Sequence, residues 1–365
     1  MSKNNKKGLS ANAKWGIALI VEVIIIVIMG VCYFNFWFND KMSQIQTKDL
    51  DETQLNINEG ANEAQKGYTT IALFGIDARD VNSMEEGNRS DSIMIASINN
   101  DTKEIRIVSV YRDTLLEVAD GSGLTTKVTH AYAYGGPELA IQTLNANLDL
   151  EITEFATVNF LGLTKAIDDL GGITIDVKEA ELPMLNACIS EQISVTGIYS
   201  DGVFQTGEQL LNGTQATGWA RIRSTDQGDI TRTERQRTVI SKMVAKAKSS
   251  DMDTINNIID DVFPNVLTSL SKDELLSLAK SVFDYQLGAN AGFPFAYQAV
   301  EHAEKGSILV PADLTSNVAA LHQFLFDSES YIPTQSVQNI SSKIQSETGV
   351  SAVPITLPST TTTTE

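Results

Sequence analysis

The sequence predicts an α/β fold: a single domain over roughly residues 68–327, with a central mixed β-sheet flanked by helices, on one N-terminal transmembrane helix. Two observations predict it. Short β-rich runs alternate with segments whose apolar residues recur at helical spacing. Ahead of them, residues 15–38 are almost entirely apolar. A chain of 365 residues with 42% hydrophobic residues can also bury a sizeable core.

The first predicted element is the membrane anchor. Residues 15–38 contain one ionisable side chain, Glu22, and as a helix they would span about 36 Å. Lysines precede the run and aromatic residues close it, so residues 1–14 are expected in the cytoplasm and the large domain outside the cell. A cleaved signal peptide is the alternative, but the run is too long and lacks a small-residue cleavage site. Glu22 marks either a helix partner in the membrane or a position near the interface.

Cysteine usage and charge agree with a single-pass protein of the cell membrane. Cys32 lies in the predicted span and Cys188 stands alone outside, so we expect no intrachain disulfide in the exported domain. Exported domains of this kind are common in Gram-positive bacteria. A net charge of -19 and a pI near 4.6 make nucleic acid a poor partner.

The next segments are a stalk and three strands. Residues 39–67 are polar and predict a stalk between the membrane and the domain. From Tyr68 the texture changes, and three β-rich runs follow, ending or beginning in charged residues: residues 69–79 (TTIALFGIDAR), 89–99 (RSDSIMIASIN) and 104–113 (EIRIVSVYRD). Strand ends are where α/β sheets place ligands.

Helices and strands then alternate to the end of the domain. The patterns predict a helix at 137–147 opened by Pro137, a strand–helix–strand unit at 155–177, a short helix at 206–217, a long helix from Thr231 to about Lys248, two amphipathic helices within 252–285, and a strand and a helix within 305–326. Residues 328–365 are rich in Ser, Thr and Gln, and predict a disordered tail.

An arginine cluster stands out against this acidic background. Residues 219–237 hold five arginines and no lysine: Arg221, Arg223, Arg232, Arg235 and Arg237. Alternation predicts a strand at 220–223 with Arg221 and Arg223 on one face, and Thr231 with Glu234 resembles a capping box that opens the following helix. A helix N-terminus beside paired guanidinium groups favours an anion such as phosphate. The alternative is a solvated charged face.

Acidic and basic residues also pair at the predicted strand ends: Asp77 with Arg79, Arg89 with Asp91, and Arg112 with Asp113. Carboxylates from two strand ends suit a hard divalent cation such as Mg²⁺, which takes one or two protein carboxylates and completes its shell with phosphates and water. The alternative is a set of structural Asp–Arg pairs at loop mouths.

Other kinds of chemistry have little support. The chain contains no G-x-S-x-G, no H-E-x-x-H and no Walker lysine motif. Its three histidines are His130, His302 and His322, and none has neighbours that suggest a catalytic triad. We therefore expect His130 to be structural, and we do not expect Cys188 to be a nucleophile.

Several of these segments, in this order, resemble the LytR–CpsA–Psr family of Gram-positive cell-wall enzymes: GIDAR, RSDSIMIASIN, VSVYRDT, KVTHAYAYGG, LGGITIDV, LNGTQATGWARIR and GDITRTERQR. The match covers about residues 70–250. The resemblance implies phosphotransfer of a glycopolymer from undecaprenyl pyrophosphate to peptidoglycan, with the polyprenyl chain held in a long apolar tunnel between sheet and helices. The glycopolymer could be teichoic acid, capsule or a secondary wall polysaccharide.

The resemblance also implies roles for individual residues. Asp77 and Asp91 would hold Mg²⁺, or Mn²⁺ in its place, and Asp229 would be the base near the acceptor hydroxyl, with Arg112 and Arg232 also catalytic. The pyrophosphate contacts would be Arg112, Arg221, Arg223, Arg232 and Gln236, with Arg89 and Asp113 in support. The loop STDQGD departs from the family pattern, which leaves the role of Asp226 open.

Two rival functions use the same residues. A polyprenyl-pyrophosphate hydrolase would replace the acceptor hydroxyl by water, and a membrane-bound sensor would bind lipid-linked polymer without turning it over. The short segment before the span carries no DNA-reading motif, which counts against a transcriptional sensor. A requirement for peptidoglycan separates transferase from hydrolase.

Overall fold

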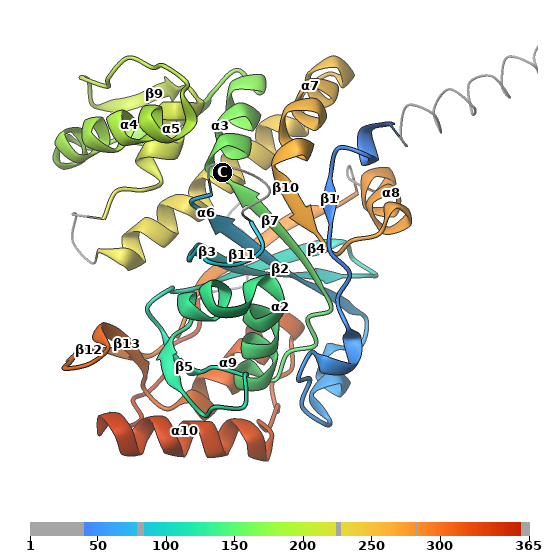
Figure 1. Ribbon diagram of the computed structural model, residues 1–365, viewed down its shortest axis with the longest axis vertical. Coiled ribbons are helices and arrows are strands. Elements are labelled where there is room, and N and C mark those ends of the chain that lie inside the picture. Colours follow the sequence, from blue (N-terminus) through green and yellow to red (C-terminus); the bar gives the residue numbers. More distant parts are fainter. Residues whose placement is uncertain (1–39, 79–83, 224–227, 282–283, 359–365) are drawn as a thin grey trace, which may run out of the picture. The chain divides into compact units, whose positions relative to one another are not determined.

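A computed structural model describes residues 40–78, 84–223, 228–281 and 284–358 (Figure 1). The chain divides into two compact units, Met1–Gln44 and Ile45–Glu365, and the following description concerns the second. The predicted tail 1–14 and span 15–38 lie outside the described residues. Within the described ranges, no helix is long and apolar enough to cross a membrane.

The second unit is built on a seven-stranded mixed sheet with the order β1-β10-β7-β2-β3-β4-β11. β2, β3 and β4 are antiparallel neighbours, whereas β7 runs parallel to β2 and β11 parallel to β4. The predicted mixed sheet is therefore confirmed. The strands are β1 (Gln46–Thr47), β2 (Tyr68–Ile76), β3 (Ser90–Asn99), β4 (Glu104–Val110), β7 (Glu154–Asn159), β10 (Val266–Thr268) and β11 (Gln286–Phe293).

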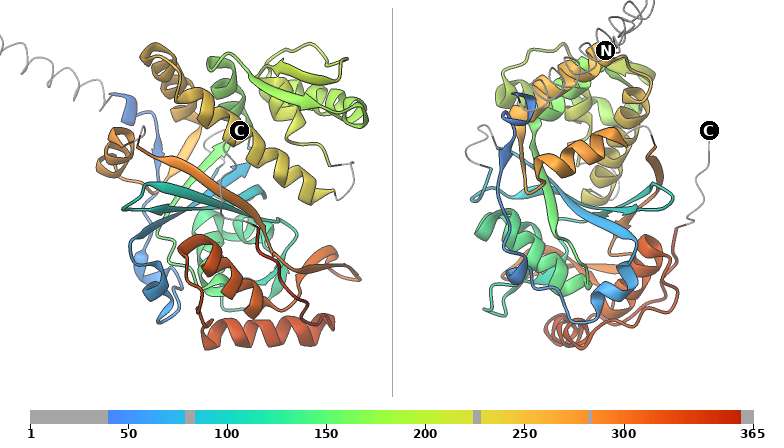
Figure 2. Two further views of the ribbon diagram at one scale, coloured as in Figure 1. Left: turned by 180° about the vertical axis from the view of Figure 1, so that it is seen from behind. Right: turned by 90° about the vertical axis from the view of Figure 1, so that its right-hand side faces the viewer.

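Helices cover both faces of this sheet (Figures 1 and 2). One face carries α2 (Thr129–Leu148) and α9 (Leu314–Phe326), with α10 (Gln335–Thr348) packed on the outside of both, and the other face carries α3 (Phe160–Asp169) and α6 (Asp229–Ala247). Because both faces are covered, β3 has a near-continuous buried apolar run instead of a strict alternation. The largest core lies under α2 and α9, and a smaller one lies among α4 (Leu182–Thr196), α5 (Gly213–Trp219) and α6.

The remaining elements are short. Besides the main sheet, the described residues form three two-stranded antiparallel sheets: β5 (Leu115–Glu117) with β6 (Thr125–Lys127), β8 (Ile173–Val177) with β9 (Gly207–Leu211), and β12 (Tyr297–His302) with β13 (Gly306–Pro311). The other helices are α7 (Met252–Val262), α8 (Lys272–Lys280) and the 3-10 turns η1 (Glu52–Gln54), η2 (Ala61–Gln65), η4 (Glu179–Glu181) and η5 (Phe263–Asn265).

Helix α2 bends at a Gly-Gly pair, which directs its first turns toward the end of the sheet. Gly136 has φ of 65°, and a Cβ there would lie 1.9 Å from the carbonyl oxygen of Glu85, so only glycine fits. Pro137 opens the second part of the helix, as predicted. The strand–helix–strand prediction for residues 155–177 is also confirmed by β7, α3 and β8.

Part of the predicted stalk belongs to the domain. β1 pairs with β10 at the sheet edge, and Leu55 and Ala61 are fully buried. Asn58 donates hydrogen bonds to the side chain of Asp149 and to the backbone of α2. The prediction of a stalk over residues 39–67 is therefore wrong from Ile45 onward, because a few apolar residues anchor an otherwise polar segment.

The predicted disordered tail, 328–365, also contains ordered structure. α10 is capped by the hydroxyl of Thr334 and buries Val337 and Ile344 in the main core. Lys343 forms an ion pair with Glu117 at 2.6 Å. Disorder was inferred from a Ser/Thr-rich composition, but two apolar residues on one helical face suffice to hold this helix against α2 and α9.

Three local predictions also fail. Residues 206–217 form strand β9 followed by α5 instead of one helix, and residues 220–223 follow the end of α5 without forming a strand. Helix α6 begins at Asp229, after Gly228 with φ of 60°, so no capping box forms at Thr231.

Candidate functional site

The sheet topology brings three of the predicted strand ends together. β2 ends at Ile76, β3 begins at Ser90 and β4 ends at Val110, and the antiparallel register places all three at one edge. Asp77 follows β2, Asp91 is the second residue of β3, and Arg112 lies two residues beyond β4. The side chains of Asp91 and Arg112 form an ion pair with 2.6 Å between Oδ1 and Nη1.

Asp91 lies at a β-bulge. Gly75 pairs with Ser92 and the next residue, Ile76, pairs with Ser90, so Asp91 is the extra residue of β3. A bulge twists the strand locally and redirects a side chain that regular pairing would place elsewhere. The sequence gives no signal for this irregularity, although it placed Asp91 at a strand end.

The N-terminus of α6 meets this sheet edge. Arg232 is 2% exposed, with its Nη2 2.7 Å from Oδ1 of Asp229 and donating to the backbone oxygen of Asp91 at 3.0 Å. Arg112 Nε lies 3.4 Å from the same Asp229 oxygen. Two guanidinium groups thus join the first residue of α6 to the ends of β3 and β4. Burial lowers the pKa of Arg232 to about 10, which still leaves it charged at neutral pH.

Burial affects the two carboxylates differently. Burial raises the pKa of Asp229 above its ordinary value, and Arg232 and Arg112 only partly oppose this shift. For Asp91, burial acts in the same direction, but Arg232 and Arg112 outweigh it and lower the pKa. Neither oxygen of Asp229 has a well-directed hydrogen bond within the described residues. Asp91 is therefore held ionised, whereas Asp229 is the better proton acceptor.

Arg221 and Arg223 reach the site from the end of α5. The guanidinium of Arg221 lies 4.7 Å from the centre of the Phe160 ring. It forms an ion pair with Glu191 at 3.1 Å and lies 4.0 Å from the carboxylate of Asp77. Arg223 is half exposed and lies 3.6 Å from Asp91. The prediction that both face one site is consistent with these contacts, although the strand proposed to align them is absent from the described fold.

The other residues of the arginine cluster differ in role. Arg235 is buried, and its side chain forms an ion pair at 2.8 Å with Glu181, which also accepts from the indole of Trp219. It is a structural residue that fixes α6 to η4. Arg237 donates to Asn290 on β11. The amide oxygen of Gln236 is buried without a hydrogen-bond partner among the described residues.

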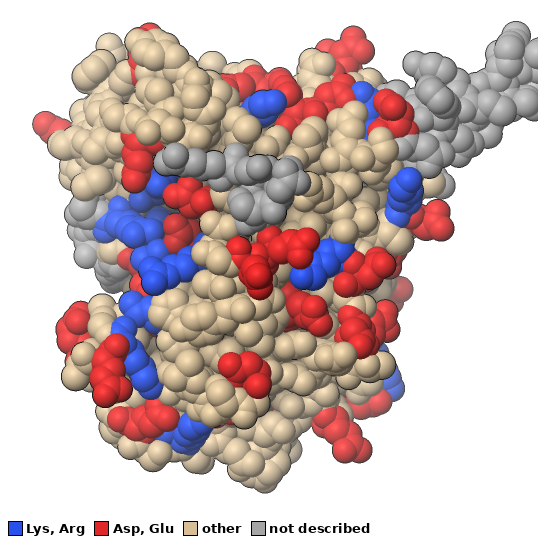
Figure 3. All heavy atoms as spheres, viewed as in Figure 1, with Lys and Arg blue, Asp and Glu red and all other residues tan. Residues whose placement is uncertain are grey.

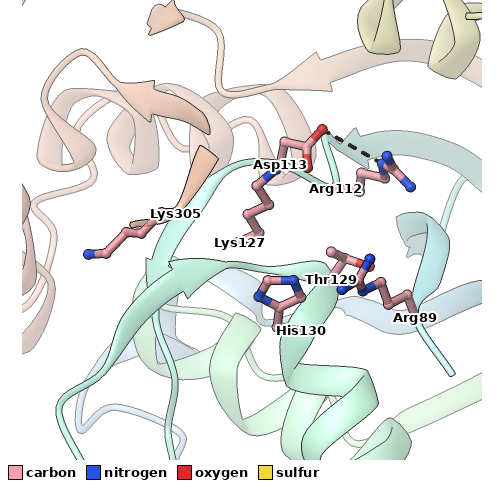
Figure 4. Close-up of a pocket in the computed structure, with 7 residues that line it drawn as sticks. All are labelled: Arg89, Arg112, Asp113, Lys127, Thr129, His130 and Lys305. Carbon is pink, nitrogen blue, oxygen red and sulfur yellow. Dashed lines mark ion pairs between the residues drawn. The ribbon is translucent and has the colours of Figure 1, made fainter. Parts of the chain in front are cut away.

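Arg89 and Asp113 lie in a polar cavity beside Arg112, with a volume of about 210 Å³ (Figure 4). The side chains lining it are Arg89, Arg112, Asp113, Lys127, Thr129, His130 and Lys305. Figure 3 shows Lys and Arg side chains gathered along one edge of this face. Lys127 and Lys305 are not among the site residues predicted from the sequence. Lys127 could have been noticed because it opens the KVTHAYAYGG motif, but nothing near Lys305 announces it.

The donor set for a metal is small. Within the described ranges, no three His, Cys, Asp or Glu side chains are placed to hold a metal ion together. Asp77 and Asp91 offer two carboxylates at one sheet edge, which fits Mg²⁺ or Mn²⁺ when phosphate oxygens and water supply the other ligands. Arg79 and Asp226 lie outside the described residues.

A model of the LytR_cpsA_psr family matches residues 32–287. The chain is 30% identical over 263 residues to the "Polyisoprenyl-teichoic acid--peptidoglycan teichoic acid transferase TagU" of Enterococcus faecalis, covering 71% of this chain and 80% of that protein. A protein of the same name from Oceanobacillus iheyensis is 31% identical over 293 residues, covering 76% and 84%.

A solved structure shares the fold. It is described as "LytR-CPS2A-psr family protein YwtF (TagT) with bound octaprenyl pyrophosphate lipid" and matches with a TM-score of 0.50 and 21% identity, covering 83% of this chain and 100% of that one. That likeness supports the α/β architecture described above.

Proposed function

Because the chain belongs to the LytR_cpsA_psr family, we propose that it is a phosphotransferase that moves an anionic glycopolymer from undecaprenyl pyrophosphate to peptidoglycan. Teichoic acid is the first candidate polymer, since both TagU relatives are named for it, and capsule or a secondary wall polysaccharide are the alternatives. The observation that carries the proposal is the proton acceptor Asp229, of raised pKa, set between two arginines that can hold phosphate oxygens.

The proposed reaction needs one nucleophile and one proton acceptor. A peptidoglycan hydroxyl attacks the phosphorus that carries the sugar, and the bond from that phosphorus to the bridging oxygen breaks. Asp229 takes the hydroxyl proton, a phosphodiester forms, and undecaprenyl phosphate leaves. Neutralising the negative charge of the pyrophosphate oxygens is the main demand of phosphoryl transfer. Four arginines supply the positive charge: Arg112, Arg221, Arg223 and Arg232. Mg²⁺ on Asp77 and Asp91 would add positive charge there.

We also propose how the chain is placed at the membrane and where it holds the lipid. Residues 15–38 anchor the protein in the cell membrane with residues 1–14 in the cytoplasm, which places the domain beside lipid-linked donors outside the cell. The polyprenyl chain occupies an apolar tunnel between the sheet and its helices. Gln236 adds an amide contact to the pyrophosphate, and Arg89 and Asp113 support the site.

The test measures lipid binding and polymer transfer on the same variants of the full chain in detergent. Arg221→Lys and Arg223→Lys should each slow transfer by part of the about 10²–10³-fold that complete loss of the arginine contact would cost, because lysine keeps the charge but loses the planar fork. Asp229→Asn should bind polyprenyl pyrophosphate but fail to transfer. If all three variants transfer polymer at the parental rate, the site is elsewhere.

Product analysis distinguishes the rival functions. The transferase should release undecaprenyl phosphate only when peptidoglycan is present, and the polymer should appear on the glycan. Release without peptidoglycan would indicate the hydrolase, and tight lipid binding with no turnover under either condition would indicate the sensor.

A further inference from the structure

The polar cavity next to Arg112 is built from four separate parts of the fold. Arg89 precedes β3, Arg112 and Asp113 follow β4, three residues come from the β6–α2 junction, and Lys305 comes from the turn between β12 and β13 (Figure 4). Its lining holds four cationic side chains and one carboxylate. A volume of about 210 Å³ is several times the roughly 30 Å³ that one water occupies, so a group larger than water fits.

The charges in this cavity are incompletely compensated. Lys127 lies 3.0 Å from Asp113, and Lys305 lies 3.1 Å from Glu347 of α10. Arg89 makes no hydrogen bond or ion pair with any described residue. In an acidic protein, a partly enclosed cavity of this kind indicates an anion site.

The first turn of α2 is fixed beside the cavity. Thr129 is tied to both strand ends, because its hydroxyl donates to Ser90 and its N–H donates to the backbone oxygen of Arg112. These two bonds hold the start of α2 at the wall of the cavity that Thr129 lines. Burial, with Arg89 and Lys127, lowers the pKa of His130, whose Nδ1 is 2.9 Å from the hydroxyl of Thr126.

This cavity extends beyond the reaction site. It shares Arg89, Arg112 and Asp113 with that site, but Lys127, His130 and Lys305 form no ion pair or hydrogen bond with Asp91 or Asp229 in the described structure. Lys305 also lies outside residues 32–287, the part that the family model matches. The turn that carries it is fixed to α10 through Glu347, in the C-terminal part of this chain.

We propose that this cavity binds a second oxyanion of the donor, a phosphate of the polymer beyond the sugar that is joined to the pyrophosphate. The inference rests on the proposed function and adds a preference for phosphate-bearing polymers over neutral ones. Arg112 lines both the cavity and the reaction site, so an anion held here lies beside the reacting phosphate. Two arginines and two lysines suit the several acceptor oxygens of a phosphate.

The first experiment needs no lipid. Binding of a soluble glycerol phosphate trimer to the full chain in detergent is followed by ³¹P NMR. Lys305→Gln should weaken binding about tenfold, the scale of one charge-assisted hydrogen bond. Glu347→Gln breaks the same ion pair but leaves the lysine, so it should bind as tightly as the parent or tighter. Equal weakening by both variants would mean that only the fold of the turn matters and would overturn the proposal.

A second control uses the same helix. Lys343→Gln removes the ion pair with Glu117, at a side chain that does not line the cavity, and should leave trimer binding at the parental value. Competition by a peptidoglycan fragment, with no effect of the trimer, would assign the cavity to the acceptor instead and would also overturn the proposal.

The second experiment separates this inference from the proposed function. Two polyprenyl-pyrophosphate disaccharides are compared, one with a glycerol phosphate on its outer sugar and one without. The parent should bind the phosphorylated donor about tenfold more tightly, and Lys305→Gln should bring the ratio near one. If the parent binds both donors with equal affinity and transfers both, only the proposed phosphate site is overturned. Failure to bind either donor would overturn the proposed function, and the trimer experiment would still decide on the cavity.

Discussion

Asp91 and Asp229 contact the same two arginines, yet their pKa values shift in opposite directions. Asp91 has both oxygens near guanidinium groups, Arg112 at 2.6 Å and Arg223 at 3.6 Å, and stays ionised. For Asp229, burial outweighs the attraction of Arg232 and Arg112, and its pKa rises. The same cations thus serve one residue that must remain a charge and one that must exchange a proton.

The raised pKa of Asp229 predicts the pH profile of transfer. The base must be deprotonated, so the rate should fall as the pH drops through the raised pKa of Asp229, above the range of an ordinary aspartate. The measurement is kcat/KM for transfer between about pH 4 and pH 8, spanning ordinary and raised carboxyl values. A profile that falls only below the ordinary aspartate pKa would exclude Asp229 as the base.

The lowered pKa of Asp91 predicts a pH-dependent contribution to stability. A carboxylate whose folded pKa lies below the unfolded one stabilises the fold above the unfolded pKa, and this contribution is lost as the pH falls through the folded pKa. Asp91→Asn should therefore cost about 1–3 kcal/mol of unfolding free energy at pH 7. Urea unfolding at several pH values measures it, and a cost that persists unchanged in acid would argue for lost packing instead.

Helix α6 carries one residue of the candidate site and one residue that fixes the helix to the fold. Its first residue, Asp229, serves the site, and Arg235 two turns later is fixed by Glu181 at 2.8 Å. Removing the charge of one buried partner leaves the other uncompensated, which costs about 3–5 kcal/mol. Glu181→Gln should lower the melting temperature and slow transfer, whereas Glu179→Gln, at a neighbouring exposed position, should change neither. A stable but inactive Glu181 variant would show that the pair acts on chemistry alone.

Helix α10 should stabilise the whole second unit. Val337 and Ile344 are buried in the main core, and each such side chain contributes about 1.5–3 kcal/mol. Ending the chain after Asp327 should therefore lower the unfolding free energy by several kcal/mol, while ending it after Pro358 should not. Urea denaturation of both truncated forms gives the comparison. Equal stability of the two would mean that α10 adds nothing to the core.

These elements show what periodicity could and could not predict. Apolar spacing located α2, α3, α6, α7, α8 and α9, because each has an apolar face that needs a core. Among the elements that it missed are β10 to β12 and α10, whose place depends on partners far away in sequence, as when β10 pairs with both β1 and β7. The bulge at Asp91 escaped for the same reason, since only the pairing with β2 defines it.

At the scale of the whole molecule, the sequence predicts which residues form the site better than it predicts how they are arranged. Charge type and position at strand ends indicated Asp91 and Arg112, the family resemblance implied Asp229, and in the structure Arg112 contacts both carboxylates. Lys305 and Glu191 could not be found, because they come from remote segments that the fold brings near arginines already chosen. The spacing of the five arginines predicts a single anion site, whereas in the structure Arg235 is buried and paired with Glu181.

The charge of the whole chain, -19, opposes the charge of its site. At low salt the long-range field repels an anionic polymer, while contacts within 4 Å in the cavity act locally. Screening at about 0.1 M, where the Debye length is about 10 Å, weakens the distant repulsion more than those contacts.

The association rate constant of the phosphorylated donor should therefore rise between about 10 mM and 100 mM salt and fall at higher salt, as screening reaches the site itself. A donor without the polymer phosphate should show a smaller rise, because its only charge is the pyrophosphate. Stopped-flow binding to the full chain in uncharged detergent measures both. A steady fall from the lowest salt would mean that the local cations, not the total charge, govern the approach of the polymer.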